Sequence, residues 1–169
     1  MPMTLISRTT LTGTAASVTF SSIPQTYQTL KLVVSARTDR NTGTTSNLIV
    51  TFNTSTASYS GRYLQGNGSA ASSASNGTAG IDALPLNQAT DTASTFSSYS
   101  IDIPNYTGST NKAVSSDVVT ENNATQAFQH LNAALWSVTS AITTITLTSF
   151  SSPTFSLLSG STFSLYGMS

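Results

Sequence analysis

The chain has 169 residues, only 7% of them charged, and six basic residues balance six acidic ones, so its net charge is zero. It contains no cysteine and a single histidine. These counts exclude disulfides and thiolate metal sites. They also argue against binding of nucleic acid through electrostatic attraction, because only two lysines and four arginines are available to contact phosphates. Thirty threonines favour β-structure, since a β-branched side chain fits a pleated surface.

Alternation of apolar and polar residues with a period of two predicts strands from end to end of the chain. The clearest segment begins at Thr29, where Leu30, Leu32 and Val34 share one face. In chain order, the expected strands cover residues 16–20, 29–37, 47–53, 99–103, 112–120, 141–149 and 162–168.

Turn and loop signals separate these strands. Turns are predicted at 23–26 and 104–108, and a polar loop at 39–45. The segment 66–80 has no apolar residue larger than alanine, so we expect a mobile surface loop rich in glycine, serine and alanine.

The segment 124–136 is ambiguous. Phe128, Leu131 and Leu135 have helical spacing, but Leu131, Ala133 and Leu135 would also share one face of a strand. We favour a short turn or helix near 124–129 followed by a strand over 131–138. Together these elements predict an all-β protein: one antiparallel β-sandwich domain over 1–169, jelly-roll-like, with eight to ten strands.

Targeting and membrane signals are absent from the sequence. Residues 1–14 contain only Leu5–Ile6 as an apolar run, so we expect no secretory signal. No apolar run approaches the ~18 residues of a transmembrane helix. We therefore expect no membrane partner and synthesis in the cytoplasm.

Residues able to do chemistry are few. His130 is the only ordinary neutral-pH base, and no G-x-S-x-G motif accompanies it, so we interpret it as a polar turn or rim residue. Ser109 and Lys112 match S-x-x-K, a motif of penicillin-recognising enzymes, but the companion motifs are missing. We interpret this match as a solvated turn that leads into a strand.

The other polar and aromatic candidates also have structural interpretations. The carboxylates could pair as in glycosidases, but we expect them to be loop residues or local charge partners; they are Asp82, Asp91, Asp102, Asp117 and Glu121. Residues 37–40 read as a charged strand end with a local ion pair. Trp136 is expected in the core, and Tyr59, Tyr63 and Tyr106 at exposed contacts. We predict no catalytic residues, no cofactor and no metal site, and hence no enzyme.

Several segments resemble small virion proteins of tailed bacteriophages. From Ile23, the sequence IPQTYQTLKLVVSARTD is similar to an Ile-Pro-x-x-Tyr turn leading into an alternating strand that ends in Ser-x-Arg. Similar pieces follow in order: IDIPNY at 101–106 with Lys112, WSVTSAITTI at 136–145, and GSTFSLYGM at 160–168. The loop at 66–80 has no counterpart in the pattern.

The resemblance implies a viral structural protein. Its members serve as capsid decoration (cement) proteins, so the expectation is a homotrimer that binds the major capsid protein lattice on the exterior of the phage head. The alternative is a tail or tail-fibre module that binds a host-surface receptor or glycan. The absence of a heptad repeat favours the decoration protein.

Overall fold

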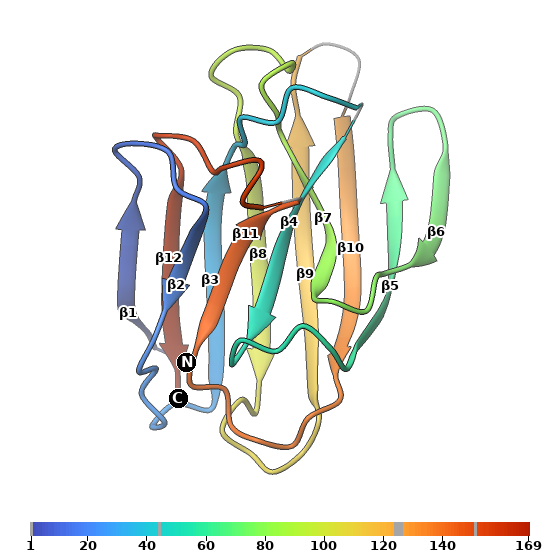
Figure 1. The fold of residues 1–169 in the computed structure, drawn as a ribbon. Coiled ribbons are helices and arrows are strands. Elements are labelled where there is room, and N and C mark those ends of the chain that lie inside the picture. Colours follow the sequence, from blue (N-terminus) through green and yellow to red (C-terminus); the bar gives the residue numbers. More distant parts are fainter. Residues whose placement is uncertain (1, 44, 124–126, 151) are drawn as a thin grey trace.

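The computed structural model describes residues 2–43, 45–123, 127–150 and 152–169, which form two antiparallel β-sheets packed face to face (Figure 1). No helix occurs among these described residues. The predicted all-β antiparallel sandwich is therefore confirmed, and the sandwich is not closed. Its strands are β1 (Met3–Thr10), β2 (Ser17–Phe20), β3 (Thr29–Ala36), β4 (Ser46–Phe52), β5 (Tyr59–Gly66), β6 (Ala71–Ser75), β7 (Ile81–Leu86), β8 (Ser97–Pro104), β9 (Lys112–Glu121), β10 (Ala127–Trp136), β11 (Ile145–Ser149) and β12 (Thr162–Met168).

Eight of the twelve strands follow the strand order of a jelly roll. Strands β1, β12, β3 and β8 are neighbours in the large sheet, and β2, β11, β4 and β7 form the small sheet. The chain therefore alternates between the sheets from β1 to β4, and again from β7 to β8 and from β11 to β12, as in a jelly roll. The predicted jelly-roll-like arrangement is present.

The remaining four strands are two hairpins that extend the large sheet. Hairpin β5–β6 is inserted between β4 and β7, hairpin β9–β10 follows β8, and the large sheet continues in the order β8-β9-β10-β5-β6. Figure 1 shows β5 and β6 at one side of the molecule, beyond the area that the small sheet covers. These hairpins bring the number of strands above the predicted eight to ten.

The undercount has a physical reason. Strand β6 is exposed at every position and β1 at nearly every position, whereas β7 is buried at all but one. A strand with two similar faces has no period-two signal, so alternation cannot reveal it. Strand β5 was also not predicted, because its outer face carries the apolar Leu64 and its inner face the polar Gln65.

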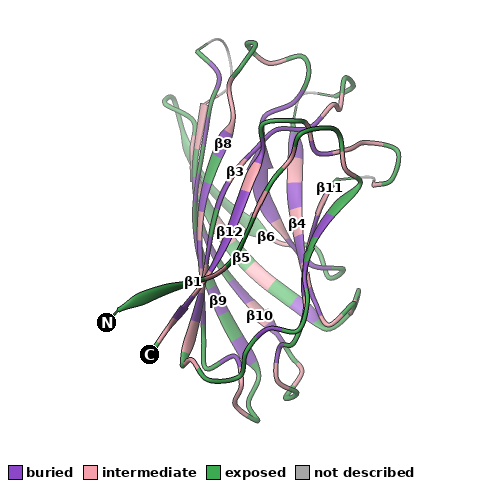
Figure 2. Cartoon of the chain, turned by 90° about the vertical axis from the view of Figure 1, so that its left-hand side faces the viewer, coloured by how far each residue is buried: buried purple, intermediate pink, exposed green. Residues whose placement is uncertain are grey.

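The core lies between the two sheets, where Figure 2 shows the buried positions. In the large sheet, Leu32 lies directly between Ile101 and Leu165, and in the small sheet Leu147 lies opposite Val50. All five are fully buried. Burying an aliphatic side chain of this size contributes roughly 1.5–3 kcal/mol.

Trp136 belongs to this core, as predicted. The ring is 2% exposed, lies edge-on to Phe52 with centroids 5.6 Å apart, and stacks on Tyr59 at 6.3 Å. Because side chains alternate along β10, the inward direction of Trp136 turns His130 and Asn132 inward as well, while Leu131 faces outward.

Most strand predictions agree with the structure. Six of the seven expected strands are found within two residues of their predicted ends, and β12 has the predicted bounds. The expected strand over 141–149 is shorter, because only Ile145–Ser149 pairs with its neighbours. Before it, the Ile142 amide donates to the carbonyl of Tyr106 at 2.9 Å instead of joining the ladder.

Two loop predictions need correction. Residues 66–80 are not a continuous loop, because Ala71–Ser75 forms β6 and pairs with β5. Backbone groups make these ladder bonds, so a stretch of alanine and serine can pair although it buries little apolar surface. The predicted turn or helix near 124–129 falls partly on 124–126, outside the described residues. From Ala127 onward the chain is strand β10, held on both sides by β9 and β5.

Candidate functional site

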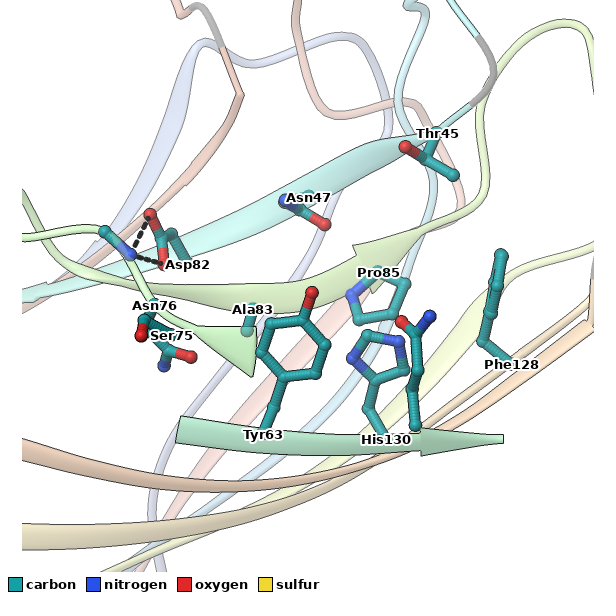
Figure 3. Close-up of a pocket in the computed structure, with 12 residues that line it drawn as sticks. Thr45, Asn47, Tyr63, Ser75, Asn76, Asp82, Ala83, Pro85, Phe128 and His130 are labelled. Carbon is teal, nitrogen blue, oxygen red and sulfur yellow. Dashed lines mark hydrogen bonds between the residues drawn. The ribbon is translucent and has the colours of Figure 1, made fainter. Parts of the chain in front are cut away.

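A polar cleft opens between the sheets where β7 faces β5 and β10 (Figure 3). Its volume is about 250 Å³. Strand β5 supplies Tyr63 and Gln65, β10 supplies His130, and β4 supplies Asn47. The register places His130 directly opposite Gln65, so these side chains project from neighbouring strands on one face.

His130 lies inside the molecule, which corrects its interpretation as a turn or rim residue. It is 6% exposed and its imidazole stacks on the ring of Tyr63, with centroids 5.0 Å apart and planes 11° apart. Phe128 meets the same imidazole edge-on at 5.8 Å. The sequence pattern could have predicted this burial. Trp136 was expected in the core, and His130 lies six positions before it, so the two side chains share one face of a strand.

Burial lowers the pKa of His130 below its usual 6.5, while a hydrogen bond with the backbone of Ala83 opposes that shift. Desolvation penalises the charged imidazolium, so the ring is neutral at neutral pH. Its Nδ1 atom has no hydrogen-bond partner among the described residues. A neutral imidazole needs one donor and one acceptor partner, so Nδ1 retains unused hydrogen-bonding capacity.

Other polar groups in the cleft are also unused. The side chains of Asn47, Tyr63 and Gln65 make no hydrogen bond to any residue that the structure describes. Asn76 donates from Nδ2 to Oδ1 of Asn132 at 2.8 Å, which leaves Asn76 Oδ1 without a partner in the described part of the chain. Buried polar groups are normally satisfied, so Nδ1 of His130 and Oδ1 of Asn76 make this cleft a candidate binding site, with the partly exposed Asn47, Tyr63 and Gln65 beside them.

The mouth of the cleft is built by the segment that joins β6 to β7. There the Asp82 carboxylate accepts hydrogen bonds from the Gly77 amide at 2.9 and 3.1 Å, as Figure 3 shows. On β5, Gly61 gives Asn76 room, because a Cβ at Gly61 would lie 2.7 Å from Asn76 Nδ2. No sequence pattern indicated that Asn47, Gln65 and Asn76 would line one cleft, because they come from three separate segments.

A second candidate surface lies on the outer face of the large sheet. Leu131 of β10 lies directly opposite Leu64 of β5, and the two are 54% and 61% exposed. We call Leu64, Val119, Leu131, Ala133 and Leu135 the outer patch. A shallow groove of about 610 Å³ runs over part of it. The solvated face of an antiparallel sheet is usually polar, so exposed apolar side chains here suggest a binding surface.

The S-x-x-K match forms no paired nucleophile and base. Ser109 is exposed, whereas Lys112 is 1% exposed and donates from Nζ to the carbonyls of Gly108, at 2.6 Å, and Thr110. The expected solvated turn is therefore wrong for the lysine, whose ammonium group is enclosed by backbone carbonyls.

The predicted carboxylate candidates each have a separate local partner. Asp102 pairs with Lys31 at 2.9 Å, as expected for a local charge partner. The other four accept hydrogen bonds from uncharged groups. Apart from Asp91, they lie on strands and not in loops. No cluster of three His, Asp or Glu side chains that could hold a metal ion occurs within the described ranges.

The segment 37–40 contains no local ion pair among the described residues, which corrects that prediction. Arg37 is 6% exposed and donates to backbone carbonyls, and Asp39 accepts from the Ser156 amide at 2.7 Å. Tyr59, Tyr63 and Tyr106 were predicted at exposed contacts, and of the three only Tyr63 is partly exposed. Tyr59 and Tyr106 are buried. Inside the molecule the Tyr59 hydroxyl accepts a hydrogen bond from the Phe52 amide, and the Tyr106 hydroxyl donates to the Pro24 carbonyl.

No protein-family model, curated protein sequence or solved structure matches the chain. Among the described residues, no helix is long and apolar enough to cross a membrane.

Proposed function

We propose that this chain is a viral structural protein, a capsid decoration (cement) protein that binds the major capsid protein lattice of a phage head as a homotrimer. The observation that carries the proposal is the outer patch, which exposes two opposed leucines on the neighbouring strands β5 and β10. Four segments resemble small phage virion proteins, and this resemblance supports the major capsid protein as the partner and the trimer as the oligomeric state.

Apolar contact and shape must provide most of the binding energy. The outer patch has few charged neighbours, namely Arg62 on β5 and Asp117 and Glu121 on β9. A shell contact through this face would remove Leu64 and Leu131 from water, which is favourable at about 25 cal/mol per Å² of apolar surface. Three copies in one trimer would add avidity without a single strong contact.

The edges of the large sheet also favour an assembled state. Strands β1 and β6 end the sheet, and both are largely exposed. Exposed strand edges can pair with other chains, and closed cyclic assembly is one way to cover them. A protein with zero net charge gains little protection from electrostatic repulsion, which increases the benefit of covering these edges.

Light scattering on the purified chain and cosedimentation with undecorated phage heads test the proposal. We expect a trimer that binds heads in hundreds of copies. The double variant Leu64→Ser/Leu131→Ser should lose head binding while circular dichroism shows an unchanged fold. Val33→Ser is the matched control, because Val33 is 40% exposed on the same face but is separated from Leu131 by β8 and β9. A monomer that does not bind heads, or equal binding by the double variant, contradicts the proposal.

The second candidate function is a tail or tail-fibre module that binds a host-surface glycan. The polar cleft favours it, because its free hydrogen-bonding groups lie where a small ligand could enter. Copy number separates the two roles, since a handful of copies per particle indicates the tail.

A further inference from the structure

The cleft between β5, β7 and β10 has polar groups that the fold does not use. Nδ1 of His130 lies on a side chain that is 94% buried, and it has no partner among the described residues. Figure 3 shows Tyr63 and His130 side by side in the cleft, with Asn47 across from them on β4. A buried polar atom without a partner destabilises the fold, so a ligand that supplied a partner would be bound at this point.

The charge of the cleft argues against an anionic ligand. Asp82 is the single charged side chain in its described lining, and both of its oxygens accept from the Gly77 amide, at 2.9 and 3.1 Å. Burial disfavours the charged form of His130. The lining therefore has no cation to hold a phosphate or carboxylate, and no second acid to hold a metal ion.

The free groups match the hydroxyls of a neutral ligand. The amides of Asn47 and Gln65 and the Tyr63 hydroxyl can each both donate and accept hydrogen bonds, and Nδ1 of the neutral imidazole can accept one. A sugar hydroxyl also donates and accepts, and neighbouring hydroxyls on one ring can bind an amide side chain at two points. Phe128 at the edge of the cleft adds an aromatic ring against which the C–H face of a sugar can pack.

Size restricts the ligand further. The cleft measures about 250 Å³, just below the ~300 Å³ at which pockets for drug-sized ligands begin. One sugar ring fits this volume, and an oligosaccharide would have to extend out of it.

We infer that this cleft binds one residue of a neutral saccharide, with Asn47, Tyr63, Gln65 and His130 as its hydrogen-bonding groups. The inference specifies the ligand class and binding groups of the second candidate function. It does not depend on the proposed capsid role, since the cleft opens between the sheets and the outer patch lies on the opposite face of the large sheet.

Chemical-shift mapping by ¹⁵N NMR tests this site with the intact chain. The probes are the methyl glycosides of glucose, galactose, mannose and rhamnose, together with N-acetylglucosamine and N-acetylgalactosamine, each at ~50 mM so that even millimolar binding is detected. We expect at least one probe to shift amides of β5, β7 and β10 around the cleft. Glucuronic acid and a blocked tripeptide amide serve as charged and peptide comparisons.

Variants connect the shifts to the named groups. Asn47→Ala and Gln65→Ala change partly exposed side chains, so they should leave the fold intact and weaken binding about three- to tenfold each. His130→Phe keeps an aromatic ring against Tyr63 but removes Nδ1, and it should weaken binding at least as much. Gln28→Ala is the matched control, because Gln28 is exposed and lies outside the cleft.

Three results would overturn the inference. One is the absence of cleft shifts with every neutral sugar. Another is a stronger response to the peptide or to glucuronic acid than to any neutral sugar. The third is binding that Asn47→Ala and Gln65→Ala leave unchanged. A cleft that binds sugar in a protein that does not bind heads would support this inference and contradict only the capsid proposal.

Discussion

One guanidinium nitrogen of Arg37 donates to both the backbone carbonyl and the hydroxyl of Thr95, at 2.8 and 3.0 Å, although the residues are 58 positions apart. The same side chain donates to the carbonyls of Thr92, at 2.8 Å, and Asp91, at 2.9 Å. Arg37 thus joins the end of β3 to the segment between β7 and β8, and the carbonyls of that segment surround its charge.

Replacing Arg37 with lysine should destabilise the protein. An ammonium group cannot reach several carbonyls in the planar fork that a guanidinium offers, so at least one charged hydrogen bond is lost, at about 1.5–3 kcal/mol. Urea unfolding measures the change. Arg62→Lys is the control, because among the described residues the Arg62 guanidinium bonds only to the neighbouring Gly61 carbonyl. This variant should change stability by less than about 0.5 kcal/mol. Equal effects of the two variants would show that the Arg37 bonds add little.

The two lysines should differ in their importance for stability. Lys112→Met leaves the carbonyls of Gly108 and Thr110 without their donor, at a cost of about 1–3 kcal/mol. Lys31→Met breaks a partly exposed ion pair with Asp102, which is expected to contribute about 0–1 kcal/mol. Thermal and urea unfolding of both variants provide the comparison. A larger loss for Lys31→Met would contradict the contribution assigned to the buried lysine.

His130 should make the protein less stable in mild acid. Its folded-state pKa is lowered, so between that value and the unfolded pKa of 6.5 the unfolded chain binds more protons than the folded chain. The free energy of unfolding therefore falls as pH drops below about 7, by at most about 1.4 kcal/mol per pH unit, and levels off below the folded pKa.

The His130→Gln variant measures this contribution, because His130 is the only histidine. Urea unfolding of both proteins at pH 5 to 8 should show a stability difference that changes with pH in the stated direction. The nearest ionisable groups in the cleft are Tyr63 and Asp82, and both are retained in the variant. If the unfolding free energies of the two proteins changed with pH in parallel, the pH dependence assigned to His130 would be wrong.

Head binding should depend weakly on salt. The proposed contact is an apolar surface on a chain with 7% charged residues, so raising NaCl from about 50 to about 500 mM should change affinity less than threefold. Cosedimentation across this range checks the expectation. A loss of binding at high salt would indicate an electrostatic contact through Arg62, Asp117 or other charges instead of the outer patch.

The strands with two different faces were predictable from the sequence. In β3 and β9 the alternation of buried and exposed residues follows directly from side-chain direction in a pleated strand, so the pattern is visible without a structure. Strands β1, β5, β6 and β7 were not predictable in this way. Strands β1 and β6 are largely exposed on both faces, β7 is buried at all but one position, and β5 has Leu64 on its outer face and Gln65 on its inner face.

The candidate sites were less predictable than the strands. Leu131, Ala133 and Leu135 were expected to share a face, and they do, but the sequence could not show that this face points outward. Their apolar character suggests the interior. The outward direction follows from Trp136, which fills the space between the sheets and fixes the direction of every second residue of β10.

The sequence by itself determined the all-β class, the two-faced strands, the core position of Trp136 and the lack of charge, because each depends on composition or on neighbours along the chain. Only the tertiary structure decided that β5 pairs with β10, which brings Leu64 beside Leu131 on one face and Gln65 beside His130 on the other. Such pairs are set by the register between strands more than sixty residues apart, and no local pattern records that register.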